Sequence, residues 1–149
     1  MTDKIAVSIA AALNAIVERE SAGYQSQFDE SAARLVVQVA KLKPLLTALE
    51  EVKQQVTGFD KIEVFVSPHG HMASVKVDNR RFSISTDMKN EKFTVEETYW
   101  SHASGENQEL FYSYDSAEEV LRAVMDCIGK FIALQRVIEQ RRAAAAGPI

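Results

Sequence analysis

The spacing of hydrophobic and polar positions changes twice along the chain. Up to about residue 56, apolar residues recur every three or four positions, which is the spacing of one face of an α-helix. Residues 61–114 instead alternate apolar and polar positions, as β-strands with one buried face do. From residue 115 the helical spacing returns. This order predicts a single α+β domain over residues 1–149, with two N-terminal helices, a five-stranded antiparallel meander and a long C-terminal helix packed on the sheet.

The N-terminal region is predicted to form two helices. One apolar face of the first helix consists of Ile5, Ile9, Leu13 and Ile16. Gly23 is expected to end this helix, and Asp29 to cap the start of the second. Pro44 lies within the second helix and either kinks it or begins a separate helix. Because the apolar spacing continues unchanged across Pro44, the pattern favours a kink.

The middle of the chain is predicted to contain five short strands. Apolar alternation places them at residues 62–67, 75–77, 82–86, 93–100 and 110–114. Turns are expected at residues 78–80 and 88–91, where Asp and Asn tolerate positive φ angles. The polar segment Ser101–Gln108 is long for a hairpin connection, so it is predicted to be a functional or mobile loop.

The C-terminal helix is predicted to begin with a capping box, because the side chains of Ser116 and Glu119 can each accept a hydrogen bond from the other residue's free backbone amide. Its apolar stripe is wider than the face of one short-stranded sheet requires. An excess of this kind commonly ends in an interface between subunits. We therefore predict that Leu134 and Ile138 form a dimer interface. Residues 143–149 are expected to be a fraying tail.

Composition and charge exclude several classes of protein. The 46% hydrophobic and 26% charged residues are typical of a folded globular chain rather than a disordered one. A net charge of −4 disfavours binding to the phosphates of nucleic acids. One cysteine, Cys127, excludes an intrachain disulfide. The apolar residues 5–17 follow a single Lys4 and contain polar interruptions, so they do not resemble a secretory signal, and we predict a cytoplasmic protein without a membrane-spanning segment.

Three histidines are the candidate metal ligands. His69 and His71 lie two residues apart, and in a strand such residues share a face. With His102 as a third ligand they could bind a metal ion, which makes a metal-dependent enzyme one alternative function. The chain contains no sequence motif for phosphate binding, for a catalytic nucleophile or for a zinc protease, so no cofactor is predicted.

Aromatic and arginine side chains suggest a surface for a partner. Arg81, Trp100, Phe111 and Tyr112 are predicted to lie near the 101–108 loop, and these residue types anchor protein interfaces. A second alternative is stacking on the bases of single-stranded nucleic acid, although the negative net charge disfavours it. Its residues would be Arg80, Arg81, Phe82, Tyr99, Trp100, Tyr112 and Tyr114. The favoured function is a non-catalytic, cytoplasmic protein-binding module of the adaptor, chaperone or inhibitor type. We expect it to be homodimeric and to bind another protein.

Overall fold

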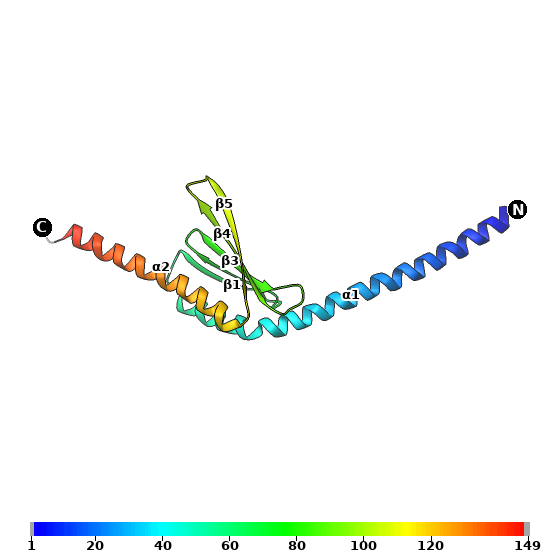
Figure 1. Ribbon diagram of the computed structural model, residues 1–149, viewed down its shortest axis with the longest axis horizontal. Coiled ribbons are helices and arrows are strands. Elements are labelled where there is room, and N and C mark those ends of the chain that lie inside the picture. The colour runs from blue at the N-terminus through cyan, green and yellow to red at the C-terminus, as the bar shows by residue number, and fades with distance from the viewer. Residues whose placement is uncertain (1, 148–149) are drawn as a thin grey trace. The chain divides into compact units, whose positions relative to one another are not determined.

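The computed structural model describes residues 2–147, which contain two helices and five strands (Figure 1). In chain order they are α1 (Thr2–Gln55), β1 (Ile62–Val66), β2 (Ala73–Val77), β3 (Arg80–Thr86), β4 (Phe93–Ser101), β5 (Glu106–Tyr114) and α2 (Ala117–Ala146). The chain divides into two units, residues 1–37 and residues 38–149. The described part of the first unit is entirely helical, and the second unit contains the sheet with α2 and the remainder of α1.

The prediction of two N-terminal helices is wrong, because α1 is a single helix of 54 residues. Gly23 lies inside it, since one glycine costs a helix only about 1 kcal/mol relative to alanine. Asp29 does not cap a helix, because its carboxylate accepts a hydrogen bond from Gln25 Nε2 one turn earlier, at 3.1 Å. Pro44 is also inside α1, on its exposed side, so the uninterrupted apolar spacing correctly predicted one helix across it.

The five-stranded antiparallel meander is confirmed. The strand order in the sheet is β1-β2-β3-β4-β5, so every strand pairs with its neighbour in sequence. The connections alternate between the two ends of the sheet: residues 67–72 and 87–92 lie at one end, and residues 78–79 and 102–105 at the other. Asp78 and Asn90 have φ angles of 56°, which the short side chains of Asp and Asn tolerate best among non-glycine residues.

The segment expected to be a long loop between the last two strands is mostly strand. Glu106, Asn107 and Gln108 belong to β5, so the connection from β4 is only four residues long, 102–105. Gly105 has a φ of 69° there and donates a hydrogen bond from its N–H to the carbonyl of Ser101 at 2.9 Å. Polar residues are tolerated in this part of β5 because it is an edge strand with exposed side chains.

One hydrophobic core joins both helices to a single face of the sheet. Buried side chains come from the second half of α1 and the residue that follows it, from the inward positions of β1 to β4 and from the first half of α2. They are Leu42, Leu45, Leu46, Leu49, Val56, Ile62, Val64, Ala73, Val75, Val77, Ile84, Phe93, Val95, Val120, Val124 and Ile128. Within the described residues of the second unit, 38–147, no helix covers the opposite face of the sheet, and we call it the open face (Figure 1). This two-layer arrangement confirms the α+β class.

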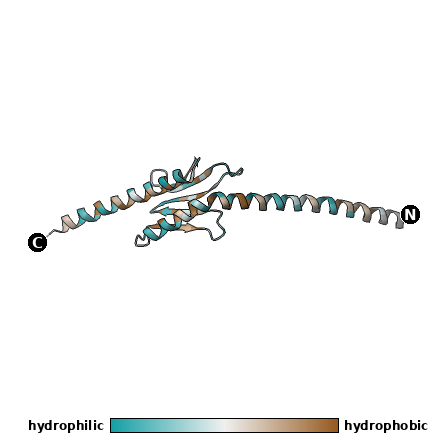
Figure 2. Cartoon of the chain, turned by 90° about the horizontal axis from the view of Figure 1, so that it is seen from below, coloured by the Kyte–Doolittle hydropathy of each residue, from teal (hydrophilic) through white to brown (hydrophobic). Residues whose placement is uncertain are grey.

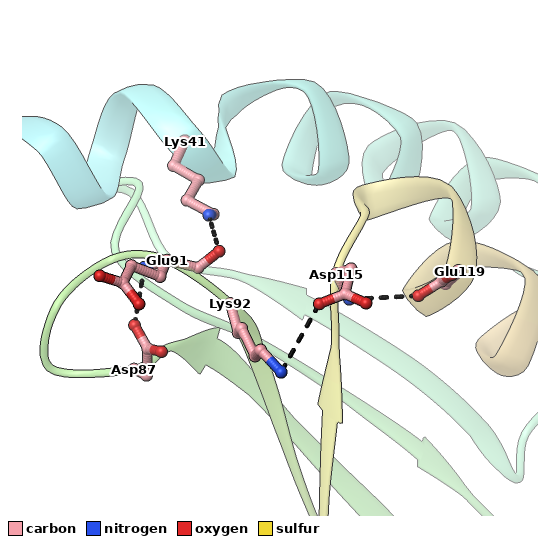
Figure 3. A network of polar contacts seen from close by, with 6 residues as sticks. All are labelled: Lys41, Asp87, Glu91, Lys92, Asp115 and Glu119. Carbon is pink, nitrogen blue, oxygen red and sulfur yellow. Dashed lines mark hydrogen bonds and ion pairs between the residues drawn. The ribbon is translucent and has the colours of Figure 1, made fainter.

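Polar contacts connect α1, the β3–β4 turn and the start of α2 (Figure 3). Lys41 Nζ donates to the carbonyl of Glu91 at 2.5 Å, and the N–H of Glu91 donates to Asp87 Oδ1 at 2.8 Å. This backbone hydrogen bond lowers the pKa of Asp87. The predicted capping box is present with one difference. Ser116 Oγ accepts from Glu119 N at 3.2 Å as predicted, but the Glu119 carboxylate accepts from Asp115 N, at 3.1 Å, one residue before the N-cap.

Candidate interaction surfaces

The structure does not bring the three predicted metal ligands together. His69 and His71 lie in the β1–β2 connection with ring centroids 6.1 Å apart, whereas His102 lies in the β4–β5 connection at the opposite end of the sheet. Within residues 2–147, no three His, Cys, Asp or Glu side chains are grouped closely enough to hold a metal ion. The geometry therefore offers no support for a metal-dependent enzyme.

Hydrogen bonds fix the loop that contains the two neighbouring histidines. His71 Nδ1 lies 3.1 Å from the hydroxyl of the buried Ser67, which also accepts a hydrogen bond from the N–H of His69 at 3.3 Å. Gln38 Nε2 donates to the carbonyl of His71 at 3.3 Å and to Ser85 Oγ at 2.8 Å, so α1 is tied to this loop. These bonds account for the polar groups of the loop and hold its backbone against the helix.

The four residues predicted to bind a partner are divided between the two faces of the sheet. Arg81 and Phe111 both lie on the open face, since Arg81 pairs with Thr98 and Phe111 pairs with Glu96. Trp100, at the end of β4, shares this face and is 44% exposed, while Phe111 is 72% exposed. Tyr112 lies on the helix-facing side, because adjacent residues of a strand point to opposite faces. The open face therefore combines three of the four predicted residues.

The division between the faces also separates the residues proposed to stack on nucleic-acid bases. The helix-facing side contains Arg80, Phe82, Tyr99, Tyr112 and Tyr114, whereas Arg81 and Trp100 are on the open face. Base stacking requires the aromatic and arginine side chains on one accessible surface. The fold therefore divides the predicted set between the two faces of the sheet.

A buried carboxylate on the helix-facing side is the feature that the sequence analysis missed. Glu97 is only 1% exposed, and its Oε1 accepts a hydrogen bond from Arg80 Nη2, whose side chain is 49% exposed. The hydroxyl of Tyr112 donates to Glu97 Oε2 at 3.3 Å. The available signal was the strand alternation, which places Glu97 on the same side as the core residues Phe93 and Val95.

A cavity of about 280 Å³ lies beside this carboxylate, between the sheet and α2. Its polar lining consists of the Arg80–Glu97 pair, Tyr112, Tyr114, Cys127 and an ion pair on α2 between Asp126 and Lys130 at 2.8 Å. Partial desolvation, followed by the proximity of the Glu97 carboxylate, raises the pKa of Tyr112. Each charged side chain of this lining is paired with an opposite charge, Arg80 with Glu97 and Lys130 with Asp126.

Cys127 should react slowly with thiol reagents in the folded protein. Desolvation raises the pKa of this thiol, so at pH 8 a smaller fraction is thiolate than in the unfolded chain. We expect its reaction with an aromatic disulfide reagent at pH 8 to be at least about threefold slower than in 8 M urea, and to accelerate as the pH rises. A folded-state rate equal to the unfolded rate would contradict this assignment. A slowly reacting thiol is consistent with the absence of a nucleophile motif.

Large apolar side chains remain exposed on the helices. Nine of them lie in the described part of the first unit: Ile9, Leu13, Ile16, Val17, Tyr24, Phe28, Leu35, Val36 and Val37. Figure 2 shows hydrophobic residues recurring along this part of α1. In α2, Met125, Leu134 and Val137 are exposed, with Leu134 at 57%, and Ile138 is partly buried. No helix within residues 2–147 has a stretch both long and apolar enough to span a bilayer.

Comparisons with known proteins identify no relative: the chain matches no protein-family model, no curated protein and no solved structure. The surfaces of the protein are therefore the basis for inferring its function.

Proposed function

We propose that this protein is a non-catalytic protein-binding module that associates with itself through its helices and binds another protein on its sheet. The observation that carries the proposal is the concentration of exposed apolar side chains on α1 before residue 38. Water-exposed helices of globular proteins normally have a charged or polar face, and an apolar surface of this extent is typical of an interface.

The composition of the exposed helix supports association with other helices. Residues 8–17 contain no charged side chain, and they combine Ile9, Leu13 and Ile16 with four alanines. The spacings of four and three residues place the three large side chains along one side of the helix. Small alanines between them allow a second helix to approach closely, so a helical partner would cover both kinds of position.

The second half of α2 offers a further apolar surface. Its buried residues Val120, Val124 and Ile128 belong to the first half of the helix, whereas Leu134 and Val137 are exposed further along. Leu134 and Ile138 lie four residues apart, so they are neighbours on one side of α2. They remain our proposed dimer contacts in this helix.

Self-association predicts a solution mass of about 33 kDa, twice the chain mass of 16.6 kDa, in sedimentation equilibrium. Leu134→Glu should give the monomer while the circular dichroism spectrum is unchanged, because a charge buried at an interface without a partner is costly. Leu13→Glu tests the exposed part of α1 in the same way. Gln140→Glu adds the same charge at an exposed polar position of α2 and should leave the mass unchanged. A wild-type chain that sediments as a monomer at 100 μM would overturn self-association.

Binding of another protein is supported by the open face of the sheet. Trp100 and Phe111 are large exposed aromatics, and Arg81 lies on the same face two strands from β5. Aromatic and arginine side chains contribute a large share of the binding free energy at protein interfaces. A module of this kind would act as an adaptor, chaperone or inhibitor, and the cytoplasm remains its predicted location.

A further inference from the structure

The outer edge of β5 has room for another strand. β5 is the last strand of the sheet, so one side of its backbone pairs with β4 and the other side faces no strand. Seven of its nine residues are exposed and the other two are partly buried. Because an edge strand presents unused backbone N–H and C=O groups, it can hydrogen-bond to an extended segment of another chain.

β5 lacks several features that protect an edge strand from pairing. Its sequence contains no Lys, Arg, Pro or Gly, and its pairing with β4 runs without a bulge from Phe93↔Tyr114 to Ser101↔Glu106. Its charged residues are two glutamates, which a partner with basic residues would neutralise. The other edge strand, β1, has only five residues, so the longer β5 edge is the one suited to a partner.

Charged and apolar side chains occupy different halves of β5. Glu106 and Glu109 are in its first half, while Leu110, Phe111 and Tyr112 follow, and all five are exposed. Within residues 2–147, neither glutamate forms an ion pair. Strand alternation places Glu109 and Phe111 on the open face, and Glu106, Leu110 and Tyr112 on the helix-facing side. Each face of the edge thus has an acidic position and an apolar position.

We infer that β5 binds an extended segment of a partner protein in which an apolar run precedes two basic residues. In antiparallel pairing, three consecutive apolar residues of the partner lie opposite Tyr112, Phe111 and Leu110. The next residue, opposite Glu109, is basic, and so is the residue three positions later, opposite Glu106. This inference rests on the proposed protein-binding function and gives the chemistry of the partner.

Two observations decide the orientation and the kind of partner. Every strand pair in this sheet is antiparallel, and antiparallel pairing is slightly more stable per residue than parallel pairing. A second copy of β5 contains no basic residue, so it supplies no cation to either glutamate. Charge complementarity therefore favours a different chain over self-pairing at this edge.

A charge exchange tests the inference. The probe is a fluorescent peptide with the sequence valine, isoleucine, valine, lysine, threonine, threonine, lysine, and the second probe has glutamates in place of the lysines. We expect the wild-type protein to bind only the lysine peptide saturably in fluorescence anisotropy. The variant Glu106→Lys/Glu109→Lys should weaken that binding about tenfold and bind the glutamate peptide instead. Each exposed ion pair contributes only modestly to the affinity, but the exchange replaces two attractive charge pairs with two repulsive ones. Glu63→Lys changes an exposed glutamate of the other edge strand and should have no effect.

Backbone pairing is tested with two further lysine peptides, methylated on alternate backbone nitrogens. Only one set of alternate N–H groups faces β5, so one peptide should retain its affinity and the other should lose binding. Four results would overturn the inference: no binding of the lysine peptide at 500 μM, equal binding of both charge forms, an equal effect of Glu63→Lys, or loss of binding with both methylated peptides. Sedimentation of the same protein reports self-association separately, so failure at the β5 edge is distinguishable from failure of the helical interface.

Discussion

Leu49→Ala should lower the free energy of unfolding by about 3 kcal/mol. Leu49 is fully buried, and shortening its isobutyl side chain to a methyl group loses transfer free energy and leaves a cavity among the surrounding core residues. The residue belongs to the part of α1 that covers the sheet, so the loss should appear as a lower urea midpoint for the β-sheet signal in circular dichroism.

The matched control is Leu13→Ala in the first unit of the same helix. Leu13 is 57% exposed, so the identical truncation should change the unfolding free energy of the sheet-containing unit by less than about 0.5 kcal/mol. Both variants should be measured in a background that is monomeric, so that any loss of subunit contacts is not counted as a loss of fold stability. Equal destabilisation by the two substitutions would contradict the division of α1 between the two units.

Substituting the two members of the Arg80–Glu97 pair should destabilise the fold to unequal extents. Arg80→Met keeps the packing of the side-chain stem but leaves the buried carboxylate with only the Tyr112 hydroxyl, and we expect a loss of about 2 kcal/mol. Glu97→Leu replaces the buried charge with an apolar group and leaves Arg80 half-exposed to water, so its cost should be below about 1 kcal/mol.

The double variant Arg80→Met/Glu97→Leu tests whether Arg80 stabilises the fold by neutralising the Glu97 carboxylate. Its stability should lie close to that of Glu97→Leu alone, because the arginine has no buried charge left to neutralise. Urea unfolding of the four proteins gives the coupling free energy directly. If Glu97→Leu were more damaging than Arg80→Met, the carboxylate would have a role that its exposure and its bonds do not explain.

Much of the second unit could be predicted because its periodicities agree with its environment. The alternation of β1 to β4 and the capping box of α2 reflect one buried face and one helix start, and both are local properties of the sequence. The single N-terminal helix was harder to predict, because Gly23 is a common helix-ending residue and Asp29 a common helix-starting residue. In α1 these weak local preferences are overridden by the helix-forming residues around them.

Two features of the candidate surfaces already follow from the meander that the sequence predicts. A meander places the first and fourth connections at opposite ends of the sheet, which separates His71 from His102. Adjacent residues of one strand face opposite sides, which separates Phe111 from Tyr112. The burial of Glu97 is different, because it depends on where α2 crosses the sheet and on the reach of Arg80 from β3. Strand alternation determines which face of the sheet the Glu97 side chain lies on, while tertiary packing determines how exposed that side chain is.

The connectivity of the sheet also has a consequence for the folding rate. Every strand pairs with its neighbour in sequence, and no connection between strands is longer than six residues, 67–72 and 87–92. Closing such short loops costs little chain entropy, and sheets built from sequential hairpins have a low contact order for an all-antiparallel sheet. Each hairpin can therefore form before distant parts of the chain meet. The slower event is the packing of α1 and α2 on the same face, because these helices come from opposite ends of the chain.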